Sequence, residues 1–456
     1  MKIVFTQQAD NRHLLLIMAG WGMTEAPFRH LSMPGYDIAV TYDYTDEVFD
    51  RDALIGYREI VVVAWSMGVM EAERILSQVE LPATLTIAIN GTPRPVSDSE
   101  GIPTKIFEGT LANLSEATLS RFNRRMCGST AAFKQFNESG PDRTIESLKD
   151  ELQVLGQRAI DSTPCSSFDW DVAVIGLDDM IFPAANQFNA WSNTRQITIE
   201  APHLPDFQAI INRLVVDKSR VAKRFGDTRH TYDISASIQL EVARKLTQQL
   251  VTAISPNAKI SRAIEIGAGD SRLTREYINR LNIDNLELWD LTLPATPQGT
   301  ICKVTAVADD AEARLRELPD NSIDLIVSSS TLQWFNSPIA AVREIQRILT
   351  PGGMAAIALY TEGTLAQLAA TTGVSLNYVS EARLTDAVKQ PCRIEFIETE
   401  TLQSDFDSTR ELLEHLRSTG VDGVGHAPSS SLRNLLRENS LRSLQFNSTT
   451  LIIRKQ

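Results

Sequence analysis

Cysteine and long apolar runs are scarce in this chain of 456 residues. The four cysteines lie far apart and form no CxxC or Cys/His pair, so we expect neither a zinc site nor another metal site nor a disulfide framework. The strongest apolar run, residues 14–19, is far shorter than the roughly 20 residues that span a bilayer. These absences predict a cytoplasmic protein that is neither exported nor embedded in a membrane.

Positive charge is also in short supply. The chain holds 44 Lys and Arg against 57 Asp and Glu, a net charge of −13, which argues against a surface that binds nucleic acid or anionic membranes as a whole. Hydrophobic residues make up 43% and charged residues 22%, a composition typical of globular domains rather than disordered or collagen-like chains. At roughly 100 to 200 residues per domain, the length predicts two or three domains.

Short apolar runs alternate with helix-sized intervals along the whole chain. The first series is HLLLIMAG, YDIAVTYDY, EIVVVAWS, TLTIAING, DWDVAVIGLDD and RQITIEAPH. The second series is KISRAIEIGAG, NLELWDL, CKVTAVADD, SIDLIVSSS, GGMAAIALY, RIEFIET and TTLIIRKQ. Runs of this length predict the strands of largely parallel sheets, and therefore two successive α/β domains.

The boundary between the two predicted domains falls near Asp217, which gives domains 1–216 and 217–456. A closing helix is expected over 204–216, and a short basic segment, 218–229, follows it. Residues 1–216 hold 17 basic and 28 acidic side chains, a net charge of −11, which leaves −2 for the remainder. The acidity of the chain therefore belongs to its first half.

A serine follows the apolar run of residues 61–63. The sequence Ala64-Trp65-Ser66-Met67-Gly68, followed by a helical segment, matches the strand, turn and helix of a nucleophile elbow, in which a sharp turn exposes the serine hydroxyl. Gly68 meets the demand for a small residue after the serine, whereas Ala64 stands where glycine is usual. Ser66 is thus a candidate nucleophile, and an ordinary serine at the end of a strand is the alternative.

An acid and a histidine follow in the chain order that such hydrolases use. Asp178 and Asp179 come after the run DVAVIG, and Asp179 fits the turn that carries the acid better; a turn or helix-capping acid is the alternative. His203 comes after the run RQITIEA, and a structural histidine is its alternative. These residues predict a Ser66, His203 and Asp179 triad.

The oxyanion that forms during attack on an ester requires N–H donors that are already in place. The residue after the nucleophile, Met67, can supply one backbone N–H. The loop Gly20-Trp21-Gly22 follows an early strand, and its glycines allow the Trp21 N–H to be the second. A simple turn with a packed tryptophan is the alternative to this predicted oxyanion hole.

The first half resembles the BioG family, α/β-hydrolases that cleave the methyl ester of pimeloyl-acyl carrier protein in biotin synthesis. The motifs that carry the resemblance are AGWGMTEAPF, AWSMG, INGTPRPV with GIP, RFNRRMC, LDDMIFPAANQFNAW and APHLPDF. The resemblance implies an α/β-hydrolase fold, Ser66 as nucleophile, His203 as general base and then acid, and Asp179 as its orienting partner. A small helical cap is expected over 110–165. Arg121, Arg124 and Arg125 are candidates to meet the acidic carrier protein, or they form a solvated face.

A glycine-rich turn opens the second half. The sequence Glu265-Ile266-Gly267-Ala268-Gly269 follows a strand and leads into a helix. A dinucleotide fingerprint would need Gly or Ala at position 272, where Arg272 stands. An acid that opens E-x-G-x-G favours instead S-adenosylmethionine, whose sulfonium and ammonium groups are cationic.

Three further segments agree with that cofactor. Asp290 ends the second strand about 20 to 25 residues on, where a carboxylate accepts both ribose hydroxyls. Asp310, preferred over Asp309, is expected to accept the adenine amino group. Ser328 opens a segment, 328–334, that can line the mouth for cofactor and substrate. Each acid alone could instead cap a helix, but together they predict a Rossmann-like class I methyltransferase fold that uses S-adenosylmethionine.

The second half resembles the BioC family, malonyl-acyl carrier protein O-methyltransferases. The matching motifs are RFGDTRHTYDISASIQLEVARKL, EIGAGDSRLT, DDAEARL, STLQWF, LTPGGMAAIALYTEGTLAQL and HLRSTGV. The resemblance implies that Tyr232 and Gln239 close over the cofactor, although Tyr232 read alone could be a packed aromatic. An ionised malonyl carboxylate is itself the nucleophile at neutral pH, so methyl transfer needs no general base. A cation should hold that carboxylate, but the sequence does not say which one.

Together the two motif sets predict a bifunctional enzyme of pimelate synthesis that acts on acyl carrier protein. The second half would methylate malonyl-acyl carrier protein, which hides a charge from apolar pockets during chain extension, and the first half would later hydrolyse the ester. A small-molecule methyltransferase joined to a general acyl hydrolase or thioesterase is the alternative. A first half that serves only as a docking module for the carrier protein is a further one, suggested by Ala64.

Overall fold

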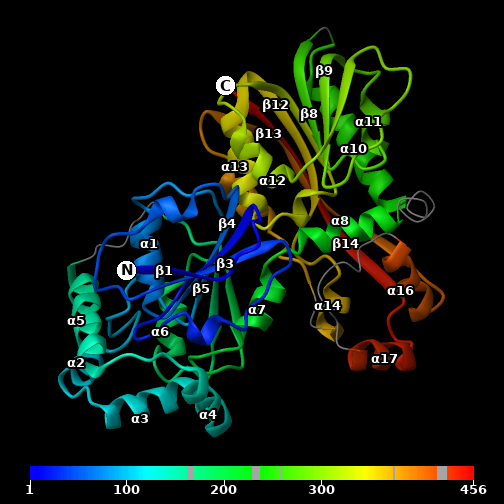
Figure 1. Ribbon diagram of the computed structural model, residues 1–456. Coiled ribbons are helices and arrows are strands. Elements are labelled where there is room, and N and C mark those ends of the chain that lie inside the picture. The colour runs from blue at the N-terminus through cyan, green and yellow to red at the C-terminus, as the bar shows by residue number, and fades with distance from the viewer. Residues whose placement is uncertain (162–167, 229–236, 257, 373–374, 419–428) are drawn as a thin grey trace. The chain divides into compact units, whose positions relative to one another are not determined.

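Two α/β units make up the described part of the chain (Figure 1). The computed structural model describes residues 1–161, 168–228, 237–256, 258–372, 375–418 and 429–456. These residues form the units Met1–Ile211 and Asn212–Gln456, each built on one seven-stranded sheet. The prediction of two successive α/β folds is confirmed.

The sheet of the first unit has the strand order β1-β3-β2-β4-β5-β6-β7. Its strands are β1 (Lys2–Gln7), β2 (His13–Met18), β3 (Tyr36–Tyr42), β4 (Glu59–Trp65), β5 (Ala83–Ile89), β6 (Val172–Gly176) and β7 (Gln196–Ile199). β1 runs antiparallel to β3, and the other neighbours pair in parallel. β4 is buried along its whole length, as expected of a strand covered on both faces. The apolar runs in the sequence do not predict β1. The side chains of this edge strand are only partly buried, so it needs no continuous apolar run.

The helices of the first unit follow its strands in turn. They are α1 (Gly68–Leu76), α6 (Ala184–Ala190) and α7 (Phe207–Leu214), which crosses the boundary at Ile211, with the short helices η1 (Ala26–Phe28) and η2 (Arg51–Leu54). Along the chain, four helices are inserted after β5 and before β6, in cyan and blue-green in Figure 1: α2 (Thr104–Ala112), α3 (Glu116–Cys127), α4 (Thr130–Ser139) and α5 (Ile145–Asp161). α3 begins with a capping box between Ser115 and Thr118 and ends at the left-handed Gly128. We call this insertion the cap.

The sheet of the second unit has the order β10-β9-β8-β11-β12-β14-β13. Its strands are β8 (Lys259–Ile266), β9 (Asn282–Asp290), β10 (Lys303–Ala308), β11 (Ile323–Ser329), β12 (Leu349–Tyr360), β13 (Cys392–Asp405) and β14 (Ser443–Lys455). β14 runs antiparallel to both of its neighbours, and the remaining pairs are parallel. The strand order reverses between β8 and β11. Ligands of open α/β sheets bind at such a switch point, beyond the carboxyl ends of the strands.

Helices cover both faces of this second sheet. They are α8 (Lys218–Thr228), α10 (Ser237–Ala253), α11 (Arg272–Tyr277), α12 (Ala311–Glu317), η3 (Leu332–Trp334), α13 (Pro338–Ile348), α14 (Ala366–Thr372), α15 (Glu381–Ala387), α16 (Thr409–Ser418) and α17 (Ser429–Glu438). Along β12, Ala356 and Ala358 join α10 in one hydrophobic cluster, whereas Ile357 and Leu359 join α13 in another. This alternation follows from the two-residue period of a strand. It explains why the run GGMAAIALY is apolar throughout.

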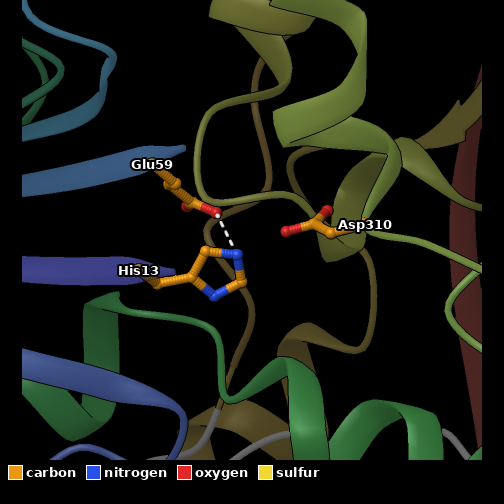
Figure 2. Close-up of side chains that lie close together, drawn as sticks. All are labelled: His13, Glu59 and Asp310. Carbon is orange, nitrogen blue, oxygen red and sulfur yellow. Dashed lines mark ion pairs between the residues drawn. The ribbon is translucent and has the colours of Figure 1, made fainter. Parts of the chain in front are cut away.

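A histidine and a buried glutamate lie close together at the other end of the first sheet from Ser66. Figure 2 shows His13 at the start of β2 and Glu59 opposite it at the start of β4, with 3.8 Å between Nε2 and Oε2. Glu59 also accepts a hydrogen bond from Thr84 Oγ1 at 3.0 Å. The third side chain drawn, Asp310, belongs to the second unit and is described with it. Among the described residues, no helix combines the length and apolar character needed to cross a membrane.

Candidate active sites

Ser66 occupies the turn between β4 and α1 in a strained conformation. Its φ of +59° lies in the left-handed region, which is costly for a residue other than glycine and is typical of functional sites. A Cβ on Gly68 would overlap the backbone of Met18 and Ala19, so only glycine fits there. Ala64, at the position where glycine is usual, is accommodated inside β4. The turn has the form of a nucleophile elbow despite that departure.

The three predicted triad residues lie within hydrogen-bonding distance of one another. The Nε2 of His203 is 3.0 Å from Ser66 Oγ, and its Nδ1 is 2.8 Å from Asp179 Oδ2. A carboxylate only accepts hydrogen bonds, so the ring proton belongs on Nδ1 and Nε2 is left to accept the proton of Ser66. This arrangement activates a serine hydroxyl as a nucleophile.

Further backbone and side-chain donors hold Asp179 in place. Its Oδ1 accepts the N–H groups of Ile181 at 2.7 Å and Phe182 at 2.9 Å, and its Oδ2 also accepts Gln187 Nε2 at 3.2 Å. Asp178 is exposed, whereas Asp179 is buried. The preference for Asp179 over Asp178 therefore agrees with the geometry.

Three residues with no predicted role in the site hold His203 in place. Its carbonyl oxygen accepts Trp65 Nε1 at 2.8 Å and Asn90 Nδ2 at 3.0 Å. The ring of Phe182 stacks on the imidazole with 5.7 Å between centroids and an interplanar angle of 3°. Backbone and ring are thus both restrained, and the side chain is 1% exposed.

The two predicted oxyanion donors border the nucleophile. A Cβ on Gly20 would lie 2.9 Å from the Cβ of Ser66, so the loop 20–22 packs directly against the serine. Within the described residues, the backbone N–H groups of Trp21 and Met67 donate to no other protein group. Two free backbone donors beside a buried serine agree with the predicted oxyanion hole.

An apolar pocket opens on Ser66 and His203. The other lining residues are Trp21, Trp65, Met67, Ile102, Ile106, Phe107, Thr110, Phe122, Arg125, Met126, Leu152, Met180 and Ile181. Arg125 is the one Lys or Arg in this described lining. Arg121 and Arg124, the other two predicted docking residues, are exposed on α3 outside the pocket, and the Arg124 guanidinium lies 4.9 Å from the centroid of the Phe133 ring. The pocket suits a hydrocarbon chain.

In the second unit, the glycine-rich turn after β8 is held against the end of β9. Gly267 and Gly269 have φ values of +77° and +49°, and a Cβ on Gly267 would overlap the side chain of Thr331. The N–H of Gly267 donates to Trp289 O at 2.8 Å, and the N–H of Gly269 donates to Asp290 Oδ2 at 3.1 Å. Asp290 therefore positions the turn as well as facing the pocket beside it.

A pocket at the switch point collects most of the predicted cofactor residues. Those that line it are Gln239, Gly267, Gly269, Asp290 and Asp310, together with Asp270, Asp309, Arg272 and Lys218. The hydroxyls of Ser329 and Ser330, also in the lining, are buried and have no hydrogen-bond partner within the described residues. Tyr232 lies outside the described residues.

Two predicted cofactor residues lie outside this pocket lining. Glu265 is fully buried and accepts a hydrogen bond from Tyr277 Oη of α11 at 2.7 Å. Burial raises the pKa of Glu265 to about 7. Ser328 is also fully buried, and its hydroxyl donates to Ile266 O at 3.0 Å. The side chains of both residues bind within the protein, and the neighbours Ser329 and Ser330 face the pocket instead.

Asp310 belongs to a buried charge cluster. Its Oδ1 accepts the N–H of Glu312 at 3.0 Å, which caps α12, and its Oδ2 lies 2.6 Å from Lys218 Nζ. Lys218 also lies 2.7 Å from Glu312 Oε2 and is 7% exposed. Lys218, the first residue of the basic segment, is therefore a buried partner of two acids.

Each half of the chain is similar to a known protein family. Residues 1–208 match the family model of pimeloyl-ACP methyl esterase BioG, and residues 264–357 match that of a methyltransferase domain. A malonyl-acyl carrier protein O-methyltransferase of Bacteroides fragilis is 37% identical over 423 residues, which cover 91% of this chain and 85% of the relative. The chain belongs to the malonyl-acyl carrier protein O-methyltransferase family.

This malonyl-acyl carrier protein O-methyltransferase family member also resembles a two-activity protein. The biotin biosynthesis bifunctional protein BioHC of Cellvibrio japonicus is 24% identical over 490 residues, covering 94% of this chain and 95% of the relative. A crystal structure of BioG from Haemophilus influenzae is 38% identical and covers 44% of this chain and 94% of that chain, with a TM-score of 0.42. The resemblance of the first half to BioG and of the second half to the methyltransferases is confirmed by the family matches.

Proposed function

We propose that this bifunctional enzyme of biotin synthesis divides its two reactions between domains 1–216 and 217–456. The second domain transfers a methyl group from S-adenosylmethionine to the free carboxyl of malonyl-acyl carrier protein. The first domain hydrolyses pimeloyl-acyl carrier protein methyl ester to pimeloyl-acyl carrier protein and methanol. The hydrogen-bonded chain from Ser66 through His203 to Asp179 is the observation that carries the esterase assignment.

In the esterase, Ser66 Oγ attacks the ester carbonyl while His203 Nε2 takes its proton. The N–H groups of Trp21 and Met67 stabilise the oxyanion, and Asp179 stabilises the imidazolium. Methoxide leaves as methanol with the proton from His203, which leaves an acyl ester on Ser66. Water, deprotonated by His203, then releases the pimeloyl carboxylate and restores the serine. The apolar pocket holds the hydrocarbon chain.

The charge of the second pocket and its unpartnered hydroxyls suit S-adenosylmethionine. Four carboxylates, at residues 270, 290, 309 and 310, line the pocket and would attract a molecule that carries a sulfonium and an ammonium. The hydroxyls of Ser329 and Ser330, unpartnered within the described residues, can form hydrogen bonds with its polar groups. When bound, the molecule supplies an electrophilic methyl group. Asp290 would hold the ribose hydroxyls, Gly267 and Gly269 would allow close approach, and Asp310 would accept from the adenine amino group.

The chain's own residues then serve mainly to align the acceptor. The malonyl carboxylate is already ionised, so an oxygen lone pair forms the new bond without a proton leaving. The apolar side chains of Val221, Phe225 and Trp334 line the same pocket and help to exclude water. α8 therefore contributes to the site rather than serving only as a connection between domains.

Acyl carrier protein is the proposed partner of both sites. Arg125 lies in the lining of the esterase pocket, with Arg121 and Arg124 on the same helix, so this face offers positive charge in a domain that is acidic on average. A cluster of exposed cations favours approach of an acidic protein. The cap helix α3 is thus the proposed docking face of the esterase.

Two assays on the full chain test the assignment. Incubation with malonyl-acyl carrier protein and isotopically labelled S-adenosylmethionine should add one methyl ester. Ser66→Ala should retain that methylation and lose cleavage of pimeloyl-acyl carrier protein methyl ester. Persistent cleavage in Ser66→Ala would overturn the triad, and equal rates on free and carrier-bound malonyl thioesters would favour a small-molecule methyltransferase.

A further inference from the structure

A buried carboxylate in the cap contacts the oxyanion loop of the first unit. Glu151 of α5 is fully buried, and its Oε2 accepts the N–H of Gly22 at 3.0 Å. The preceding residue, Trp21, supplies the proposed oxyanion donor, and its indole Nε1 donates to Leu148 O of the same helix at 2.8 Å. One turn of α5 therefore binds both the side chain of Trp21 and the peptide group that follows it.

Glu151 is also linked to the other end of that loop through Tyr44. Its Oε1 accepts the N–H of Tyr44 at 2.9 Å, and the hydroxyl of Tyr44 donates to Ala19 O at 2.8 Å. Ala19 is the residue directly before Gly20, which packs against Ser66. The carboxylate thus restrains the loop 20–22 directly at Gly22 and, through Tyr44, at Ala19.

A buried arginine compensates the charge of Glu151. Arg143 Nη1 lies 2.6 Å from Glu151 Oε2, and Arg143 Nη2 lies 2.7 Å from Ser147 Oγ and 3.3 Å from Asp43 Oδ1. Burial raises the pKa of Glu151 even with this cation beside it. Placing a charge so deep costs stability unless its partners are well arranged, and an apolar residue could fill the same space without that cost.

We propose that Glu151 is a positioning residue for ester hydrolysis, which holds the Trp21 peptide where its N–H meets the oxyanion. The inference rests on the proposed esterase function of Ser66. Three donors converge on the two oxygens of Glu151: the N–H groups of Gly22 and Tyr44, and the guanidinium of Arg143. Only a carboxylate can accept from all of them, because an amide would turn an NH2 group toward at least one donor.

Glu151→Gln tests the proposal, with Glu146→Gln on the exposed side of the same helix as its matched control. Misplacing one oxyanion donor should lower kcat for a methyl ester about 10- to 100-fold, while KM stays within about twofold. Affinity for a trifluoromethyl ketone, which mimics the tetrahedral adduct on Ser66, should fall by a similar factor. Glu146→Gln should match the parent enzyme in all three measurements.

The outcomes separate this inference from the esterase assignment. Loss of cleavage in Ser66→Ala together with an unchanged kcat in folded Glu151→Gln overturns the positioning role alone. Cleavage that survives Ser66→Ala overturns the esterase site itself. Methyl transfer by the second unit, measured in the same preparation, reports whether that unit of the chain is intact.

Glu151→Asp provides a second variant should Glu151→Gln not fold. It keeps the charge opposite Arg143 but is one methylene shorter, which withdraws the carboxylate from Gly22. We expect about a 10-fold loss of kcat with little change in KM or in thermal unfolding. A kcat equal to that of the parent enzyme would overturn the proposal.

Discussion

The two candidate sites differ in whether the polar side chains at the pocket already have partners inside the protein. In the first unit, both oxygens of Asp179 and both ring nitrogens of His203 have partners inside the protein. In the second unit, the described partners leave the buried hydroxyls of Ser329 and Ser330 unpaired at the pocket. The triad is therefore assembled before the ester binds, and the N–H groups of Trp21 and Met67, free of other partners in the described part of the chain, are left for the oxyanion. A transferase site is completed by its donor, because the donor must bring the missing hydrogen bonds.

Asp179→Asn should give the largest separation between the two activities. An amide in place of the carboxylate would favour the wrong tautomer of His203, so kcat for ester cleavage should fall about 10⁴-fold. Methyl transfer should stay unchanged because its residues lie in the other unit. Parallel assays of both reactions on one preparation provide the measurement, and a loss below about tenfold would contradict the role of Asp179.

Glu265→Gln should change the pH dependence of stability in the second unit. The folded-state pKa of Glu265 is raised to about 7 by burial, above its unfolded value, so the folded state binds the extra proton between about pH 4.5 and 7. The contribution of protonated Glu265 to the free energy of unfolding is fully present below about pH 4.5. It is lost as the pH rises through 7, which lowers the free energy of unfolding by up to about 3 kcal/mol.

Hydrogen exchange of β8 amides at pH 5 and pH 8 measures this effect. The parent protein should lose more protection at pH 8 than Glu265→Gln does, after correction for the intrinsic exchange rate. Glu276→Gln, a partly exposed acid on the same helix as Tyr277, serves as the control and should follow the parent protein. An identical pH dependence in Glu265→Gln would show that Glu265 does not titrate in this range.

Asp290→Asn should weaken the methyl donor site without touching the esterase. Loss of the charged acceptor for the N–H of Gly269, which is also the proposed acceptor for the ribose, should raise the KM for S-adenosylmethionine about 10- to 100-fold. Ester cleavage should remain within about twofold. Calorimetric titration with S-adenosylhomocysteine checks the binding directly, and unaltered affinity would remove Asp290 from the site.

Of these substitutions, Ala64→Gly should have the smallest effect on ester cleavage. Ala64 is the departure from the usual elbow motif, yet it is fully buried in β4 and the turn at Ser66 keeps its left-handed φ. Glycine there should alter kcat for ester cleavage less than about threefold and lower stability by about 1 kcal/mol, through backbone entropy. A tenfold gain in rate would instead mean that the alanine restrains the nucleophile.

The parts of each site that sequence could predict depend on residue type and order along the chain. Ser66, Asp179 and His203 could be found because a strand, a turn and a chain order together specify a triad. Glu265 could not be placed, because the motif does not reveal that its side chain turns under the loop toward Tyr277. Asn90 lies in the motif INGTPRPV, but the motif does not reveal that its side chain donates to the carbonyl oxygens of Pro202 and His203.

The contacts between distant segments could not be predicted from the sequence, for a different reason. Glu151 and Gly22 are 129 residues apart, and α5 is an amphipathic helix whose buried acid looks like an ordinary charged residue in the sequence. Lys218 likewise reads as part of a basic segment, and only the fold shows it between Asp310 and Glu312. Such contacts depend on packing between distant segments, which a local pattern does not encode.

The position of the cap between β5 and β6 limits how this esterase can be re-engineered. Cap helices form much of the pocket wall, which makes their exchange an obvious route to new chain-length preferences. The same segment carries Arg143, Leu148 and Glu151, so a grafted cap without them would leave the N–H groups of Gly22 and Tyr44 unsatisfied. Successful chimaeras should therefore keep residues 143–151 of this chain and vary only the helices before them.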